Sequence, residues 1–178
     1  MSVGTGGFLQ PEEIVKQLNI KKNITIADFG CGGGYVSIPL AKIAEQGKIY
    51  ALDILKEALE AVQSRAKLEG VLNIETIHCN LELENGSTFE NNSIDLVILA
   101  NILFQSSNKD AIIKEAKRVV KKSGQIVIID WKLDQAMGPP NNLVIDLKAI
   151  KELGKEQGLK LKKELPVDQY HWGVIFNK

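Results

Sequence analysis

The stretch "ADFGCGGGYVSIPLAK", Ala27–Lys42, decides the fold of this 178-residue chain. An apolar run ends beside an acid and leads into four glycines within Gly30–Gly34, after which apolar residues resume at helical spacing. A glycine-rich turn between a strand and a helix lets a ligand approach the main chain more closely than a Cβ atom would allow. The stretch therefore predicts a strand, a ligand-binding turn and a helix, in that order.

The spacing of the glycines distinguishes three kinds of nucleotide-binding turn. A P-loop needs lysine and then serine or threonine after its last glycine, whereas Tyr35 and Val36 follow here. A dinucleotide-binding turn, G-x-G-x-x-G, needs a small residue where Tyr35 stands. What remains is an acid followed by glycines at alternate positions, from Asp28 to Gly34. Asp53 ends the next apolar segment, where a carboxylate can accept hydrogen bonds from two ribose hydroxyls.

Strand-length apolar runs alternate with helical patterns along the whole chain, which predicts a single α/β domain over residues 1–178. The helix after the glycines should begin irregularly, near Ser37, because Pro39 can stand only in a first turn. The polar passage 80–93 holds at most a fragment of helix. We expect strands at 23–29, 48–54, 73–79, 94–100 and 125–131, and further helices at 11–18, 56–70 and 110–124.

The C-terminal end predicts a reversed strand. Segments 158–165 and 170–177 are both strand-like, and only "PVDQ", residues 166–169, lies between them. Four residues cannot carry a crossover connection, so these strands should be antiparallel neighbours. The pattern indicates a mostly parallel sheet with one reversed strand, unlike the all-parallel sheet of the dinucleotide dehydrogenases.

Composition argues against several partners. Lysine plus arginine equals aspartate plus glutamate, at 22 each, so no global positive field would attract nucleic acid or an anionic membrane. Two cysteines and two histidines, without zinc-ligand spacing, predict that no metal is bound. No apolar segment has the length of a membrane span or the form of a signal peptide, which predicts a cytoplasmic protein.

The acid, the alternating glycines and Asp53 together resemble the class I S-adenosylmethionine-dependent methyltransferases. "NNSIDLVILANILFQ", residues 91–105, resembles the family's fourth-strand motif, and "AKRVVKKSGQIVIID", residues 116–130, its helix, glycine turn and fifth strand. The resemblance extends from Ile14 to Phe176 and is nearest to the small ubiquinone-biosynthesis-type branch, with type 11 and type 25 members. It implies a three-layer α/β sandwich with a seven-stranded Rossmann-like sheet, order 3-2-1-4-5-7-6, strand 7 antiparallel.

The resemblance also implies S-adenosylmethionine as cofactor, with S-adenosylhomocysteine as its product. Asp28 would lie near the amino group of the cofactor, Asp53 would bind the ribose and Ile54 would press on the adenine. Asn80 would receive the adenine amino group in place of the family's usual aspartate, and Asn101 would lie near the reacting methyl. The implied cofactor-binding residues are Asp28, Gly30, Cys31, Gly32, Gly34, Asp53, Ile54, Asn80, Leu81 and Asn101.

Each of these assignments has an alternative interpretation. The glycines can serve only a tight turn, and Asp53 can serve only as a cap for the next helix. Asn80 and Asn101 can be plain loop or turn residues. Cys31 is interpreted as a small filler and not as a nucleophile, because no base stands beside it in sequence.

The methyl acceptor should bind beyond the carboxyl ends of the parallel strands. Displacement of a methyl group from a sulfonium depends mainly on alignment of the two reactants, and a base is needed only if the acceptor is protonated. The sequence therefore does not identify a catalytic residue. His171 is the histidine placed to act as a base near neutral pH, with packing or hydrogen bonding as its alternative role. The pocket candidates are Asn101, Phe104, Gln105, Asp130, Trp131, Lys132, Tyr170, His171 and Trp172.

We therefore expect an enzyme that transfers a methyl group from S-adenosylmethionine to a small-molecule acceptor by in-line displacement. Two other functions stay open, a non-catalytic S-adenosylmethionine-binding module and a NAD-dependent oxidoreductase. Residues 1–10 are expected to be either flexible or a lid over the cofactor. The sequence leaves open the acceptor and a choice between monomer and homodimer.

Overall fold

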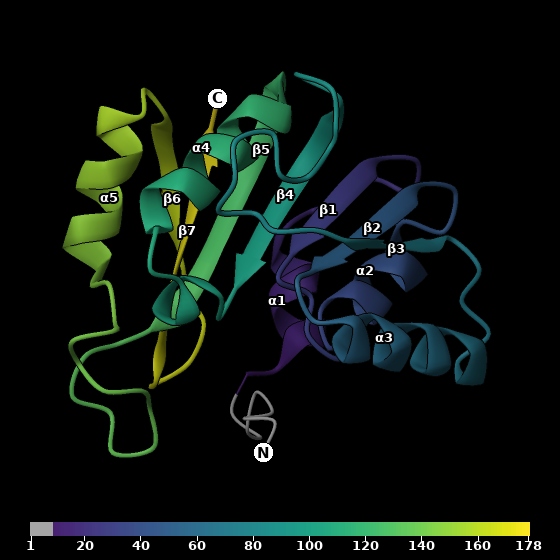
Figure 1. Ribbon diagram of the computed structural model, residues 1–178, viewed down its shortest axis with the longest axis horizontal. Helices are drawn as coiled ribbons and strands as arrows, with labels where there is room; N and C mark the ends of the chain where they lie inside the picture. The colour runs from purple at the N-terminus through teal and green to yellow at the C-terminus, as the bar shows by residue number, and fades with distance from the viewer. Residues whose placement is uncertain (1–8) are drawn as a thin grey trace.

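The computed structural model describes residues 9–178, which form a seven-stranded sheet between two layers of helices (Figure 1). The strand order is β3-β2-β1-β4-β5-β7-β6, and β7 runs antiparallel to both of its neighbours. This confirms the predicted order and class. Of residues 1–10, predicted to be either flexible or a lid, the first eight lie outside the described residues. The strands are β1 (Thr25–Phe29), β2 (Lys48–Asp53), β3 (Ile74–His78), β4 (Ile94–Ala100), β5 (Val120–Trp131), β6 (Lys160–Leu165) and β7 (His171–Asn177).

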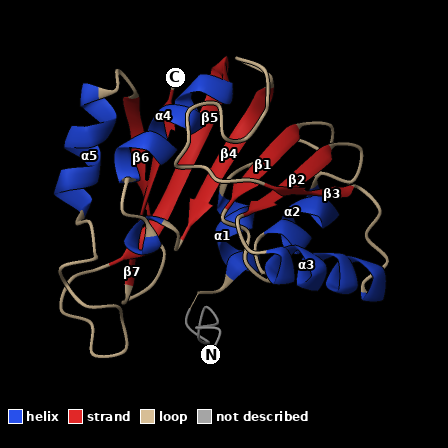
Figure 2. Ribbon diagram, viewed as in Figure 1, coloured by secondary structure: helices blue, strands red, loops and turns tan. Residues whose placement is uncertain are grey.

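The helices divide into two layers, with α1, α2 and α3 on one face of the sheet and α4 and α5 on the other (Figure 2). Helix α2 begins at Ser37, as predicted from the position of Pro39. Both faces of the central strands are covered, which explains why β1 and β4 are mostly apolar and do not alternate between polar and apolar residues. The helices are α1 (Pro11–Gln17), α2 (Ser37–Ile43), α3 (Lys56–Leu68), α4 (Lys109–Val119), α5 (Leu147–Glu156) and the 3-10 turn η1 (Leu103–Gln105).

The core alternates along each strand because successive residues point to opposite faces. In β1, Ile26 packs toward α1 and α2, whereas Phe29 packs toward α4. The polar passage after β3 contains no helix, but it closes the face of the sheet beside β2. There the ring of Phe89 lies edge-on against Tyr50, with 4.9 Å between centroids. This passage is therefore part of the wall of the core.

The predicted helix over residues 110–124 is wrong at its C-terminal end. Helix α4 ends at Val119, and Val120 already pairs with Ile94 in the sheet. A register shift follows, because the next pair in the ladder is Leu96 with Gln125. The intervening residues bulge outward, as β-bulges do where a strand takes up extra residues.

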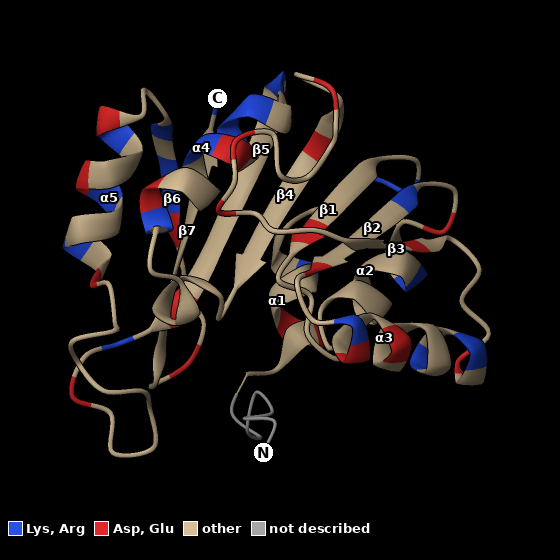
Figure 3. Ribbon diagram, in the orientation of Figure 1, with Lys and Arg blue, Asp and Glu red and all other residues tan. Residues whose placement is uncertain are grey.

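The C-terminal hairpin has the predicted direction and brings its turn to the carboxyl edge of the sheet. His171, the first residue of β7, pairs with Trp131, the last residue of β5. Strand β6 is the exposed outer strand, and its lysines discourage pairing with another chain. Figure 3 shows both signs of charge along α3 and α5, in keeping with the equal totals of acidic and basic residues. Within residues 9–178, the structure has no helix long and apolar enough to cross a bilayer.

Candidate cofactor and acceptor site

The glycine turn between β1 and α2 has three residues in the left-handed region, at Gly30, Gly32 and Gly34, with φ of 73°, 50° and 78°. A Cβ atom at Gly30 would overlap the side chain of Ile102, and one at Gly34 would lie 3.1 Å from Val62 Cγ2. A Cβ at Gly32 would meet nothing within 4 Å. A side chain at Gly30 would thus clash with Ile102 and one at Gly34 would lie tight against Val62, whereas the space beside Gly32 is open.

Asp53, at the end of β2, ties this turn to the start of α3. Its Oδ2 accepts from the backbone nitrogen of Gly32 and its Oδ1 from that of Leu55, both at 2.9 Å. The predicted alternative, a cap of the next helix, is not observed: Leu55 holds the N-cap position of α3, no side chain caps it, and the bond from Leu55 to Asp53 closes a turn before the helix. A carboxylate offers about four lone-pair sites, so the two bonds leave capacity for ribose hydroxyls.

Asp28 lies behind the turn and is 1% exposed. The hydroxyl of Ser37, the first residue of α2, donates to its Oδ2 at 2.5 Å. Burial raises the pKa of Asp28 to about 6, with a further contribution from the charge of Asp53, while the Ser37 bond opposes the shift. The sequence analysis missed Ser37, although its position at the predicted helix start was a usable signal.

The residues after β2 and β3 form the predicted adenine side. Ile54 and Leu55 are 56% and 60% exposed, an unusual pair of adjacent apolar side chains on the surface. The oxygen of the Asn80 side chain accepts from the backbone nitrogen of Glu82 at 2.9 Å, which is a local turn. Leu81 is buried in the core. The turn role of Asn80 is thus observed, and its adenine contact stays a prediction.

Cys31 is buried within the glycine turn. Burial raises the pKa of its thiol, and the charges of Asp28 and Asp53 raise it further. A thiol held in its protonated form is a poor nucleophile. This environment favours the interpretation of Cys31 as a filler.

Asn101 follows β4 and has a left-handed backbone, with φ of 56°. It is 6% exposed, and its backbone is held on both sides: its nitrogen donates to Ile129 O at 2.9 Å, and its carbonyl accepts from Gln105 Nε2 at 2.8 Å. Its side-chain nitrogen lies 3.4 Å from Nε2 of His171. Its Oδ1 has no partner, and among residues 9–178 it is the one buried side-chain polar atom without one.

His171 is 2% exposed and is held from three sides. Its Nδ1 lies 2.9 Å from each carboxylate oxygen of Asp168, and its ring lies 4.3 Å from the ring of Trp131 between centroids. Burial lowers the pKa of His171; the bond with Asp168 opposes this change, and the charge of Lys132 adds to it. The sequence analysis missed Asp168, whose i, i+3 spacing from the histidine was the available signal.

Comparisons with known proteins identify the family of this site. Residues 20–167 match the family described as "Methyltransferase domain". The chain belongs to the class I S-adenosylmethionine-dependent methyltransferases. It is 33% identical to a probable cobalt-precorrin-6B C(15)-methyltransferase (decarboxylating) of Methanosarcina acetivorans, over 84% of this chain and 76% of that protein.

Further relatives support the same family. A demethylmenaquinone methyltransferase of Geobacillus is 28% identical over 71% of this chain. The chain spans about half the length of that relative, 53%. A crystal structure of a SAM-dependent methyltransferase from Aquifex aeolicus superposes with a TM-score of 0.85 at 26% identity, covering 95% of this chain and 89% of that one. The chain is thus an enzyme of methyl transfer, and neither alternative function has support from these relatives.

The pocket candidates of this methyltransferase divide into two groups. Trp131, Lys132 and His171 lie together at the carboxyl edge, where the Lys132 ammonium donates to the carbonyl of Asp168 at 2.8 Å. Trp172 and Asp130 are both buried, so their contact with an acceptor stays a prediction. Asp130 is fully enclosed in the fold. It accepts from the backbone of Leu103, Phe104 and Trp131, and so fixes η1, while burial raises its pKa to about 6. Of the remaining candidates, Phe104 and Tyr170 are partly buried and Gln105 is exposed.

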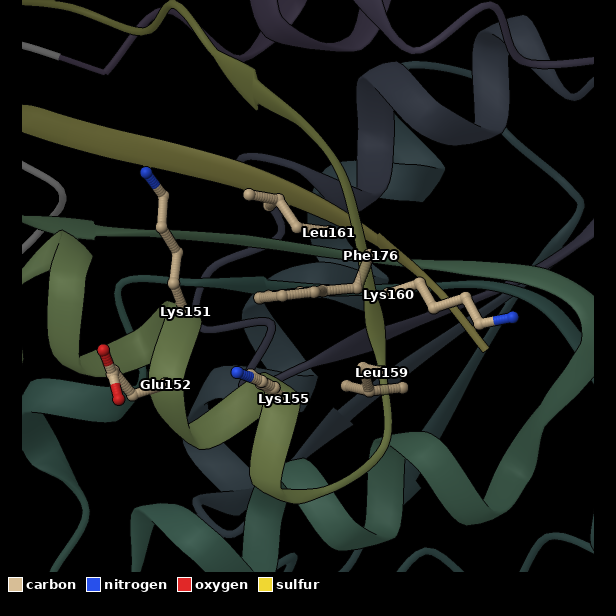
Figure 4. Close-up of a pocket in the computed structure, with 7 residues that line it drawn as sticks. All are labelled: Lys151, Glu152, Lys155, Leu159, Lys160, Leu161 and Phe176. Atoms are coloured by element: carbon tan, nitrogen blue, oxygen red, sulfur yellow. The ribbon is translucent and has the colours of Figure 1, made fainter.

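Two hollows in the described part of the methyltransferase lie away from the glycine turn. One, of about 390 Å³, lies between α5 and the outer strands and is lined by Lys151, Lys155 and Phe176 (Figure 4). It is at the opposite end of the sheet from His171, because Phe176 is near the end of β7. The other, of about 150 Å³, lies between α1 and the 166–169 turn and is lined in part by Asp168. Only the second adjoins the carboxyl edge.

The residues of the site fit the cofactor that the family uses. Gly32 leaves the main chain open, two carboxylates stand beside it, and Asn101 keeps a buried acceptor without a partner. Within residues 9–178 no group of three or more histidine, cysteine or acidic side chains could hold a metal ion.

Proposed function

We propose that this methyltransferase binds S-adenosylmethionine along Gly30–Gly34 and presents it to a small-molecule acceptor at the carboxyl edge of β4, β5 and β7. The open backbone beside Gly32 is the observation that carries this proposal, because it leaves room for a ligand where Gly30 and Gly34 face the side chains of Ile102 and Val62. When bound, the cofactor supplies a methyl group already activated by a positively charged sulfur.

In this proposal, each residue around the turn binds a different part of the cofactor. Asp53 would hold the ribose with the lone pairs that its bonds to Gly32 and Leu55 leave free. Ile54 would cover the adenine, since its side chain is exposed beside the carboxylate. Asp28 and Asp53 provide negative charge, which favours a ligand carrying an ammonium and a sulfonium group. The chain contributes alignment and exclusion of water, which are the main requirements of an in-line displacement.

The acceptor would lie near Trp131 and the second hollow, between α1 and the 166–169 turn. The names of the relatives provide two acceptor classes to test, a corrinoid precursor and a demethylated menaquinone. His171 is buried and has both ring nitrogens engaged, so we assign it a hydrogen-bonding role before that of a base. The cytoplasmic location, the oligomeric state and the lack of a nucleic-acid partner stay predictions.

Calorimetric titration tests cofactor binding directly. We expect S-adenosylhomocysteine to bind and NAD to give no heat, because Tyr35 stands where a dinucleotide turn needs a small residue. At a hundred times its Kd, S-adenosylhomocysteine should add about 2.7 kcal/mol to the free energy of unfolding. Labelled methyl from S-adenosylmethionine should then enter a member of a small-molecule panel. If the protein binds NAD more tightly than S-adenosylhomocysteine, the proposal is overturned.

A further inference from the structure

Three side chains from separate segments form a hydrogen-bonded chain at the carboxyl edge. Asp168 belongs to the turn before β7, His171 begins β7 and Asn101 follows β4. The carboxylate of Asp168 lies 2.9 Å from Nδ1 of His171, and Nε2 of His171 lies 3.4 Å from the side-chain nitrogen of Asn101. The chain therefore links the hairpin to the loop that borders the glycine turn.

The chemistry of the three groups fixes the direction of this chain. The carboxylate of Asp168 also accepts from the backbone nitrogens of Tyr170 and His171, each at 2.7 Å, so it acts as an acceptor. Nδ1 of His171 must then carry the hydrogen, and a neutral imidazole leaves Nε2 as an acceptor. Asn101 has to turn its NH₂ group toward that nitrogen. Its Oδ1 consequently points away from His171.

This orientation leaves Oδ1 of Asn101 buried without a donor. Buried polar atoms in proteins nearly always have a hydrogen-bond partner, so one that lacks it beside a ligand site indicates a ligand group. Asn101 stands next to Ile102, whose side chain closes against Gly30. The loop that carries Asn101 thus borders the proposed cofactor turn.

We propose that Asp168 and His171 position the amide of Asn101 so that its Oδ1 accepts a hydrogen bond from the ammonium group of the bound cofactor. The inference rests on the proposed function, which places ribose and adenine over β2. Strand β4 lies on the other side of β1 from β2. The amino-acid end is therefore the part of the cofactor that reaches Asn101, and the ammonium is its hydrogen-bond donor. His171 is a positioning residue, since it acts through Asn101.

Protonation of His171 would reverse the chain. With hydrogen on both ring nitrogens, Nε2 would face the NH₂ of Asn101 donor to donor, and the amide would have to turn over. The ligand would then meet an NH₂ group in place of the oxygen. The charged groups that face the imidazole are Asp168 from the turn, which favours protonation, and Lys132 just after β5, which opposes it. Burial lowers the pKa of His171, so this reversal is expected below the ordinary histidine range.

Binding of two nucleosides to two variants tests the proposal. Asn101→Gly removes the amide and suits the left-handed backbone, with φ of 56°. We expect this variant to bind S-adenosylhomocysteine about tenfold more weakly, which is the effect of losing one hydrogen bond to a charged group. The same variant should bind 5′-methylthioadenosine as tightly as the wild type does, because this nucleoside has no ammonium group. Asn101→Asp keeps the acceptor and should restore binding. Asn92→Gly, an exposed position with φ of 58°, is the matched control.

The tautomer of His171 provides a readout that a merely structural role would not change. The chain has two histidines, so imidazole nitrogen shifts can be assigned by NMR with a His78→Gln variant. We expect the Nδ1–H tautomer at neutral pH, and the Nε2–H tautomer with weakened S-adenosylhomocysteine binding in Asp168→Asn. An Nε2–H tautomer in the wild type, or equal loss of both nucleosides in Asn101→Gly, would overturn the inference. Failure of the wild type to bind S-adenosylhomocysteine would instead overturn the proposed function.

Discussion

The carboxylate of Asp53 accepts a hydrogen bond from the backbone nitrogen of Gly32 at 2.9 Å. The residue proposed to bind the ribose thus also shapes the turn that would hold the rest of the cofactor. Its other oxygen accepts from Leu55 at the start of α3. Loss of this side chain should therefore affect the order of the turn and the affinity for ligand together.

Replacement of Asp53 should strongly weaken binding of the cofactor. We expect Asp53→Ala to lose about 1.5–3 kcal/mol of S-adenosylhomocysteine binding, the range for hydrogen bonds to a charged group. Calorimetric titration measures the change, with Glu60→Ala on the exposed face of α3 as a control that removes a carboxylate away from the turn. Equal affinities in Asp53→Ala and the control would remove the ribose assignment.

Two glycines of the turn should respond differently to alanine. A Cβ at Gly30 overlaps Ile102 in a left-handed backbone, so Gly30→Ala should lower the free energy of unfolding by about 2–4 kcal/mol. Gly32→Ala has the same kind of backbone but no neighbour within 4 Å, so its cost should be the backbone strain alone, about 1–2 kcal/mol.

Urea denaturation and ligand titration separate the two effects. Gly32→Ala should stay folded at room temperature while its affinity for S-adenosylhomocysteine falls, because the new methyl group fills the open side of the turn. Gly30→Ala combined with Ile102→Ala should recover part of the lost stability. A Gly32→Ala variant that binds the nucleoside as tightly as wild type would show that no ligand approaches this part of the backbone.

The sequence was sufficient for the features that depend on local pattern. The spacing of glycines identified the turn, apolar runs identified the strands, and the shortness of residues 166–169 required the reversed strand. The helix predicted over 110–124 is wrong only after Val119, because Val120 pairs with Ile94 in the sheet, a contact distant in sequence. Helical propensity in the intervening residues gives no sign of that pairing.

The candidate site shows the same limit. Asp28, the glycines and Asp53 could be found because they lie on one β–turn–α unit and the strand that follows. For Asp168 the sequence offered only its i, i+3 spacing from His171, and its role depends on a turn that folds its carboxylate onto that histidine. The orphaned oxygen of Asn101 was equally invisible, because it follows from the direction of hydrogen bonds between segments about 70 residues apart.

Asp28 should make stability depend on pH in the opposite sense to a carboxylate whose pKa is lowered by folding. Its pKa is raised to about 6 in the folded state from 3.8, chiefly by burial, so the folded protein binds the proton more tightly. The contribution of Asp28 to stability is thus greatest at acid pH and is lost as pH rises from about 4 to 6. The full shift corresponds to about 3 kcal/mol.

Asp28→Asn should remove this loss. We expect the variant to gain about 1–3 kcal/mol over wild type at pH 8, and little at pH 4, in urea denaturation. Ser37 can still donate to the amide oxygen, so the packing is retained. Cofactor affinity should fall in the same variant, because a negative charge near the ammonium is lost. A gain that is equal at both pH values would mean that the proton on Asp28 is not its source.

The buried carboxylate of Glu115 in α4 should be the most sensitive point of the fold away from the site. Its side chain is 3% exposed and accepts from Nη2 and Nε of Arg118, at 2.7 and 2.8 Å, and from the hydroxyl and backbone nitrogen of Ser87. Burial alone would raise the pKa of Glu115, but these bonds together lower it. The ion pair therefore keeps a charge inside the protein.

Removal of the arginine should leave this charge buried and uncompensated. We expect Arg118→Ala to lower the free energy of unfolding by about 3–5 kcal/mol, whereas Lys114→Ala, which breaks an exposed pair with Asp110, should cost under about 1 kcal/mol. Because the pKa of Glu115 is lowered on folding, its contribution in the wild type should be lost as pH falls through the folded-state pKa. Arg118→Ala combined with Glu115→Gln should recover part of the stability in urea denaturation. If the double variant is no more stable than Arg118→Ala, the loss comes from packing of the arginine stem and not from the unpaired carboxylate.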